Sequence, residues 1–172
     1  MGAVPETALA QPAGIECADG IVVDAHMQTS DPAVLAVGDC TRFPDRRAGR
    51  ALRLESVQNA NDQARTAVAT LTGAPREHDA VPWFWSDQGS LRLQMAGLVP
   101  AEGTPGLVSV RRPGPTDAAF SLFHYVDGQL ACVESVNAPV DHMMSRKLLE
   151  AGRSPAPEQV ADAAVPLKTL LA

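Results

Sequence analysis

The first half of the chain contains two short, mainly apolar runs, at residues 21–24 and 34–37. Turn residues bound each run, and a brief continuous run of this kind is typical of a buried strand in a parallel sheet. The second run ends at Gly38-Asp39. Prolines, glycines and arginines then predict a loop through residue 53.

The pattern changes from residue 56 to residue 72, where apolar side chains recur at intervals of three and four. This spacing predicts an amphipathic helix. Ser56 is a suitable N-cap, and Gly73 followed by Pro75 ends the pattern. The polar stretch at residues 76–80 predicts a domain boundary.

The second half has a rhythm of short strands separated by turn residues. Strands are expected at residues 83–85, 91–96, 107–111, 120–125 and 130–136. Asp127-Gly128 lies between two alternating runs and predicts a hairpin. Helices are expected at about 139–151 and 157–163. An antiparallel sheet of about five strands followed by helices is an α+β domain, which we assign to residues 77–172.

The chain has 172 residues, 45% hydrophobic, with a formal net charge of −6 and a pI near 5.1. An acidic chain is a poor match for a nucleic-acid backbone. No apolar run reaches the length of a membrane helix, and no secretory signal is evident, so a cytoplasmic protein is expected. The three cysteines are widely spaced without a C-x-x-C pair, which favours free thiols over a metal site.

Residues 29–39 hold the most informative motif, a turn, an apolar run and then Gly38-Asp39. A glycine lets a ligand approach the backbone closely, and α/β folds bind nucleotides where such strands end. A carboxylate at that point can accept a hydrogen bond from a ribityl or ribose hydroxyl. The segment resembles the second FAD fingerprint of the flavoprotein reductases that have two dinucleotide-binding domains.

The resemblance extends to both sides of this motif. Residues 2–10 look like the crossover from the NADH domain back into the FAD domain, and residues 20–24 look like the strand before the fingerprint. Residues 55–64 resemble the helix whose N-terminus faces the flavin pyrimidine. Val57 matches the family's backbone contact, and Ser56 and Gln58 beside it are further candidates for cofactor binding. A surface helix merely capped by Ser56 is the alternative.

Residues 82–88 resemble the start of the C-terminal domain of oxygenase-coupled ferredoxin reductases and of rubredoxin reductases. Trp85 matches a tryptophan that lies near the flavin and the docking face in that family, where it would shield the ring. The alternative is a core aromatic cluster, because Trp-Phe-Trp in a strand packs well. We expect Trp83 or Phe84 to be core residues and Trp85 to be functional.

The resemblance implies an oxidoreductase that passes electrons from NAD(P)H through FAD to a small ferredoxin or rubredoxin. It also implies that residues 1–76 are an α/β remnant of an FAD-binding domain, ahead of the α+β domain. The family has a G-x-G-x-x-G motif in each dinucleotide-binding half, and this chain has none. We therefore expect a C-terminal portion of such an enzyme, which by itself binds FAD weakly and is inactive. No acid–base residue is assigned, and the oligomeric state is left open.

Four arginines form a local basic patch on the acidic chain, at Arg46, Arg47, Arg50 and Arg53. The patch is a candidate docking surface for an acidic ferredoxin, although a solvated loop has the same composition. Two other functions remain open. One is a disulfide reductase of the same superfamily, although the His-Pro dipeptide of those enzymes is missing here. The other is an interaction module without redox chemistry.

Overall fold

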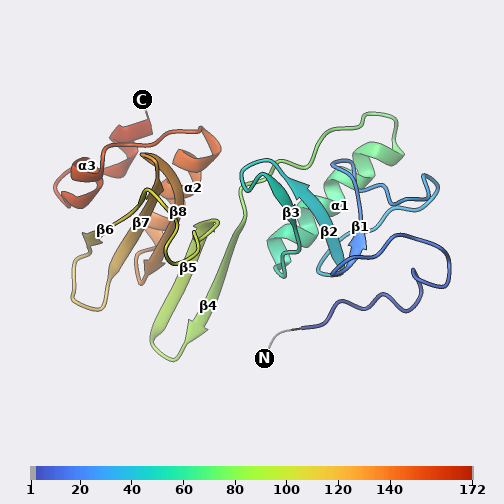
Figure 1. Ribbon diagram of the computed structural model, residues 1–172. Helices are drawn as coiled ribbons and strands as arrows, with labels where there is room; N and C mark the ends of the chain where they lie inside the picture. The colour runs from blue at the N-terminus through green and yellow to red at the C-terminus, as the bar shows by residue number, and fades with distance from the viewer. Residues whose placement is uncertain (1–2, 172) are drawn as a thin grey trace. The chain divides into compact units, whose positions relative to one another are not determined.

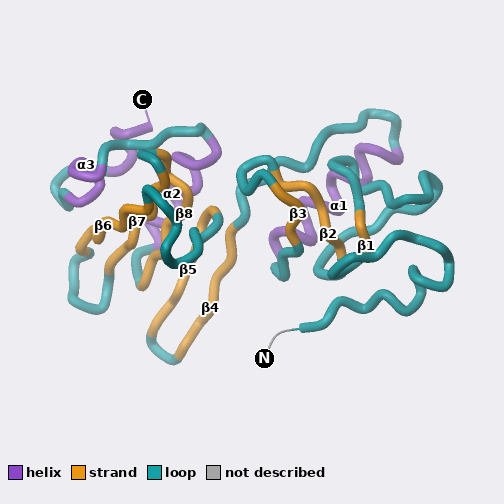
Figure 2. Tube along the Cα trace, in the orientation of Figure 1, coloured by secondary structure: helices purple, strands orange, loops and turns teal. Residues whose placement is uncertain are grey.

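The computed structural model describes residues 3–171, which divide into two compact units, one ending at Ala80 and one beginning at Val81. The division lies at the end of the polar connector, slightly beyond the change expected between residues 76 and 77. Among the described residues, the first unit combines a small sheet with one helix, and the second combines a larger sheet with several helices (Figures 1 and 2). Gly2, the first residue of the expected crossover, lies outside the described residues.

The first unit contains a three-stranded sheet in the order β1-β2-β3. Strand β1 (Ile21–Val22) runs parallel to β2 (Thr41–Asp45), which pairs antiparallel with β3 (Arg50–Leu52). Helix α1 (Val57–Leu71) follows, and Ser56 is its N-cap, as the sequence predicts. The cap orients the first turn because its hydroxyl accepts a backbone hydrogen bond there.

The core of the first unit mixes apolar and polar side chains. Met27 and Phe43 are almost completely buried, and so are Thr41 of β2 and Gln63 of α1. The ring of Phe43 meets the ring of His78 edge to face, with 5.0 Å between their centroids. The connector therefore packs over β2, and the buried polar groups must find partners within the unit.

The predicted buried strand at residues 34–37 is wrong. The segment makes one isolated antiparallel bridge, between Leu35 and Gln28, within an irregular turn. Val34 and Val37 are 36% and 37% exposed. A strand needs a continuous ladder, and within residues 3–171 this segment has a neighbour along one side only. The apolar content of residues 34–37 therefore predicted a strand that the segment does not form.

The predicted loop between residues 40 and 53 is also wrong, because it contains the β2–β3 hairpin. Thr41, Phe43 and Asp45 alternate inward along β2, which is the period of a strand. The Asp45 carboxylate accepts a hydrogen bond from the Ala48 amide at 2.7 Å and organises the turn. The alternation was missed in the sequence because arginine and proline occupy the positions between the buried residues.

The second unit is an antiparallel sheet of five strands, which confirms the prediction. The strands are β4 (Trp83–Gln88), β5 (Leu91–Gly97), β6 (Leu107–Pro113), β7 (Phe120–Val126) and β8 (Gln129–Val136). Their order in the sheet is β4-β5-β8-β7-β6. The expected hairpin at Asp127-Gly128 joins β7 to β8. Strand β4 forms one edge of the sheet and therefore pairs with β5 alone.

Helices complete the second unit (Figure 1). They are α2 (Pro139–Glu150), α3 (Pro157–Ala161) and the short 3₁₀ helix η1 (Leu167–Leu171). The first two were expected, whereas the sequence pattern missed η1. One apolar cluster joins them to the sheet and consists of Phe123, Tyr125, Leu130, Val133, Leu148, Val160 and Leu167. Burial of these side chains supplies the main stabilisation of the unit.

Arg112 on β6 fastens the chain after α3 to the sheet. Its side chain is almost buried and donates to four backbone carbonyls. The acceptors are the carbonyls of Val160 at 3.0 Å, Asp162 at 2.7 Å, Ala163 at 3.4 Å and Val165 at 3.0 Å. Its Nε lies 3.5 Å from the Asp141 carboxylate of α2. One guanidinium therefore connects β6, α2 and the C-terminal segment.

His142 lies on the buried side of α2. It is 4% exposed, and its ring contacts the ring of Trp83 with 5.7 Å between the centroids. Burial lowers the pKa of His142 to about 4, and the positive charges of Arg146 and Arg92 contribute further. The imidazole is therefore neutral at physiological pH.

No helix in the described part of the chain is long and apolar enough to cross a membrane. Over the same residues no group of acidic, histidine and cysteine side chains could hold a metal ion. The three cysteines are free thiols, and burial raises the pKa of the Cys132 thiol well above its usual range. Cys132 is therefore an unreactive core residue.

We expect Arg112→Met to lower the free energy of unfolding of the second unit by about 3–5 kcal/mol, because it removes the ion-pair partner of Asp141 and the guanidinium donor of four backbone carbonyls. Urea denaturation measures this loss, and amide hydrogen exchange over residues 157–171 should rise with it. Arg111→Met is the matched control, since Arg111 is exposed and its guanidinium carbon lies 4.7 Å from the Phe120 ring centroid. Equal losses in the two variants would contradict the role given to Arg112.

We expect acid to destabilise the protein through His142, and His142→Phe to remove that part of the effect. The folded pKa of about 4 is below the unfolded value of 6.5. The unfolded chain therefore binds the extra proton, and stability falls as pH decreases from 6.5 towards 4. The full difference is about 3 kcal/mol. Urea denaturation of both proteins across this range measures it, with His78 retained in each. Parallel pH profiles would exclude this contribution.

Candidate functional site

Gly38 is buried between β2 and α1 and has a φ of +89°, a conformation that favours glycine. Its amide donates to Gln63 Oε1 at 2.6 Å, and its carbonyl accepts from the Thr41 amide at 3.0 Å. An added Cβ would come no closer than 3.8 Å to Ala60. The backbone conformation, more than crowding, therefore explains the glycine.

Asp39 follows in the turn before β2 and is exposed. The expectation that it ends a buried strand is wrong, because residues 34–37 do not form one. Its backbone carbonyl accepts from Arg53 Nη1 at 3.3 Å. Within residues 3–171 its carboxylate makes no ion pair or hydrogen bond, so it retains its full capacity as an acceptor.

The N-terminus of α1 carries the other predicted residues of the first unit. Ser56 Oγ accepts from the Asn59 amide at 3.1 Å, and Val57 is the first helical residue and 64% exposed. The Gln58 side chain donates to the Asp62 carboxylate one turn along. No acidic residue lies in the first turn. The positive end of the helix dipole is therefore not offset by a carboxylate of its own first turn.

Gln63 and Arg53 join these two segments, and the first was missed by sequence analysis. Gln63 Oε1 accepts from Gly38 and from the Thr41 hydroxyl at 2.9 Å, so it fixes the glycine turn against α1. Arg53 contacts Asp39 and also Glu55 just before the helix, at 2.5 Å. The signal for Gln63 was a polar residue among the inward-facing positions of an amphipathic helix.

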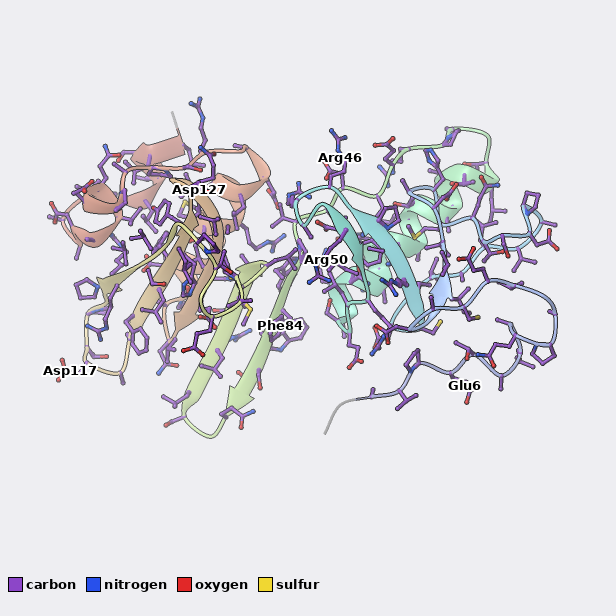
Figure 3. All side chains as sticks on the ribbon, in the orientation of Figure 1. Glu6, Arg46, Arg50, Phe84, Asp117 and Asp127 are labelled. Carbon is purple, nitrogen blue, oxygen red and sulfur yellow. The ribbon has the colours of Figure 1, made fainter. Side chains whose placement is uncertain are left out.

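Trp85 belongs to the second unit. It is 41% exposed on β4, and its ring lies 5.6 Å from that of Trp83 at an angle of 30°. Trp83 is half-buried against α2, in line with its expected core role. Phe84, labelled in Figure 3, lies on the opposite face of the strand and is 44% exposed. Of the two expected core residues, it is therefore Trp83 that packs inward.

The four arginines of the predicted docking patch lie on and around the β2–β3 hairpin, where Figure 3 labels Arg46 and Arg50. Three of them are ion-paired within the first unit. The pairs are Arg46–Glu77 at 3.5 Å, Arg47–Asp79 at 2.8 Å, Arg53–Glu55 at 2.5 Å and Arg53–Asp19 at 3.4 Å. Arg50 is exposed, and it alone of the four has no ion pair among the described residues. The positive charge of the patch is therefore largely offset.

The first unit thus presents a specific pair of polar features. The Asp39 carboxylate, which has no partner among residues 3–171, and the N-terminal end of α1 are both tied to the same segments through Gln63 and Arg53. The carboxylate suits hydroxyl groups, and the amides suit a group that carries or develops negative charge. These residues fit the ribityl chain and the pyrimidine edge of a flavin. They do not include a nucleophile paired with a base.

Comparison with known families agrees with this chemistry. Residues 83–171 match the reductase C-terminal family, and residues 1–64 match the pyridine nucleotide-disulphide oxidoreductase family. Rhodocoxin reductase of Rhodococcus erythropolis is 43% identical over 172 residues, which are 100% of this chain and 39% of that protein.

Two solved structures share the fold along almost the whole chain. The ferredoxin reductase of the CYP199A2 system from Rhodopseudomonas palustris is 45% identical with a TM-score of 0.91, over 99% of this chain and 41% of the other. The reductase in the covalent putidaredoxin reductase–putidaredoxin complex is 38% identical with a TM-score of 0.88, over 99% and 40%. The chain spans about two fifths of the length of these relatives. It belongs to the reductase C-terminal family and is similar to a part of these reductases.

Proposed function

We propose that this chain supplies the C-terminal part of an oxidoreductase that passes electrons from NAD(P)H through FAD to a small ferredoxin or rubredoxin. The observation that carries the proposal is the exposed Asp39 carboxylate beside the open N-terminus of α1, within a chain similar to ferredoxin reductases along its length. The relatives are named rhodocoxin reductase, putidaredoxin reductase and ferredoxin reductase for the CYP199A2 system.

Each predicted residue has a definite task in this proposal. A flavin accepts two electrons together and releases them singly, which links a hydride donor to a one-electron acceptor. Asp39 accepts hydrogen bonds from ribityl hydroxyls, and Gly38 allows its turn to approach them. Ser56, Val57 and Gln58 begin the helix whose amides and dipole favour negative charge at the pyrimidine edge. Trp85 offers an exposed aromatic surface for the flavin and the partner.

The disulfide reductase alternative is less well supported. The chain has no His-Pro dipeptide, and it is similar along its whole length to rhodocoxin reductase and putidaredoxin reductase. A module without redox chemistry gives no role to the exposed Asp39 carboxylate, which has no partner within residues 3–171. A cytoplasmic location accompanies the proposal, because the three cysteines are free thiols.

We expect Asp39→Asn to weaken FAD binding by roughly 10- to 150-fold, because a charge-assisted hydrogen bond is worth about 1.5–3 kcal/mol. The measurement is the flavin dissociation constant of the protein translated from the complete reading frame, by fluorescence titration after the flavin is removed. Asp31→Asn is the matched control, an exposed aspartate in the preceding loop whose carboxylate serves a local turn. Unchanged affinity in the Asp39 variant would refute the assignment.

We expect charge reversal at Arg50 to raise the KM for ferredoxin several-fold at low ionic strength, because its charge is not offset within the first unit. Arg46→Glu should have a smaller effect, since Arg46 is already paired with Glu77. Steady-state ferredoxin reduction at low and high salt measures both variants. An unchanged KM for Arg50→Glu at low salt would remove the docking proposal.

A further inference from the structure

The two tryptophans of the chain form a contacting pair on one face of β4. Trp83 and Trp85 are two residues apart, so their side chains leave the strand on the same side. Their rings lie 5.6 Å apart at 30° to each other. Their partners across the ladder are Ala96 and Gln94 of β5. Ala96 is small and fully buried, so it leaves the space above it to the Trp83 ring.

Arg146 of α2 holds the inner member of this pair. Its guanidinium carbon lies 4.3 Å from the centroid of the Trp83 ring, which is the geometry of a cation–π contact. Nη2 lies 3.7 Å from the Glu150 carboxylate one turn further along α2. Nε is buried and has no hydrogen-bond partner among residues 3–171. The cation–π contact with the Trp83 ring is therefore a main interaction of the Arg146 guanidinium.

His142 supports the same ring from one turn earlier in α2. It is four residues before Arg146, so both side chains lie on one face of the helix. Its ring contacts that of Trp83 at an angle of 58°. Both ring nitrogens are buried without a hydrogen-bond partner among the described residues. His142 therefore contacts Trp83 by packing of the two rings.

The contacts run in a line from α2 to the surface. Arg146 and His142 meet Trp83, which is half-buried, and Trp83 meets Trp85, which is 41% exposed. β4 is an edge strand, so Trp85 has a strand neighbour on one side only. A free ring at such an edge would sample several rotamers. Contact with a ring that is itself held by α2 restricts this choice.

We propose that Arg146 is a positioning residue for Trp85. With His142 beside it, Arg146 fixes the ring of Trp83, and Trp83 in turn fixes the exposed ring of Trp85 in one orientation. The structural part of this inference stands on the contacts alone. Its consequence for catalysis rests on the proposed function, in which Trp85 is the aromatic surface offered to the flavin and the partner.

Far-ultraviolet circular dichroism of this chain tests the structural part, because two indole rings in contact give an exciton couplet. The chain has two tryptophans, so the signal reports on this pair alone. Trp83→Phe defines the spectrum without the couplet. We expect Arg146→Gln to lose most of the couplet and Arg146→Lys, which retains a cation, to keep part of it. Lys147→Gln removes a positive charge from the next position of α2 and should leave the couplet intact.

The Arg146 variants are expected to fold, because that side chain is one-third exposed. The Lys variant keeps the test decisive if the Gln variant does not fold. A full couplet in folded Arg146→Gln, or equal losses in Arg146→Gln and Lys147→Gln, would overturn the inference. Neither result depends on flavin binding, so each is separate from a failure of the proposed function.

The catalytic part is tested in the protein translated from the complete reading frame. We expect Arg146→Gln to lower the rate of ferredoxin reduction relative to the rate with ferricyanide, a small acceptor that needs no docking surface. If Arg146→Gln loses the couplet but the ratio of ferredoxin reduction to ferricyanide reduction is unchanged, Arg146 positions the tryptophans but has no role in electron transfer. Loss of flavin binding in the Asp39 variant bears on the proposed function and not on this contact.

Discussion

The buried amide of Gln63 is the interaction on which the candidate site depends. Its Oε1 accepts from the Gly38 amide and from the Thr41 hydroxyl, so one atom of α1 fixes the turn that precedes β2. The turn would otherwise present unpaired polar groups inside the unit, which is costly. Because Gly38 is held against α1, the next residue, Asp39, is presented to solvent near the start of the same helix.

The second unit was predictable from the sequence because its signals are local. Turn residues separate the five strands between Trp83 and Val136, and Asp127-Gly128 directly predicts the hairpin that joins β7 to β8. The first unit was less predictable. The apolar run at residues 34–37 has the composition of a buried strand without the neighbours that make one. The β2–β3 hairpin has the reverse property, since arginines and a proline occupy its outward positions.

The site divides in the same way. Gly38, Asp39 and Ser56 could be proposed from the sequence because each belongs to a contiguous motif with a recognisable use. Gln63 was not, because its role is a contact across 25 residues that no local pattern encodes. The arginine patch shows a related limit. Composition predicts positive charge there, but three of the four charges are offset by acids elsewhere in the unit.

The clamp made by Arg112 has a consequence for how the family can vary. All four of its hydrogen-bond acceptors are main-chain carbonyls, one of Val160 within α3 and three of residues in the segment after it. Every amino acid carries such a carbonyl, so the path of this segment is set without reference to most of its side chains. Substitutions at residues 161–164 should therefore be tolerated, whereas a substitution of Arg112 removes the side chain that donates to this segment.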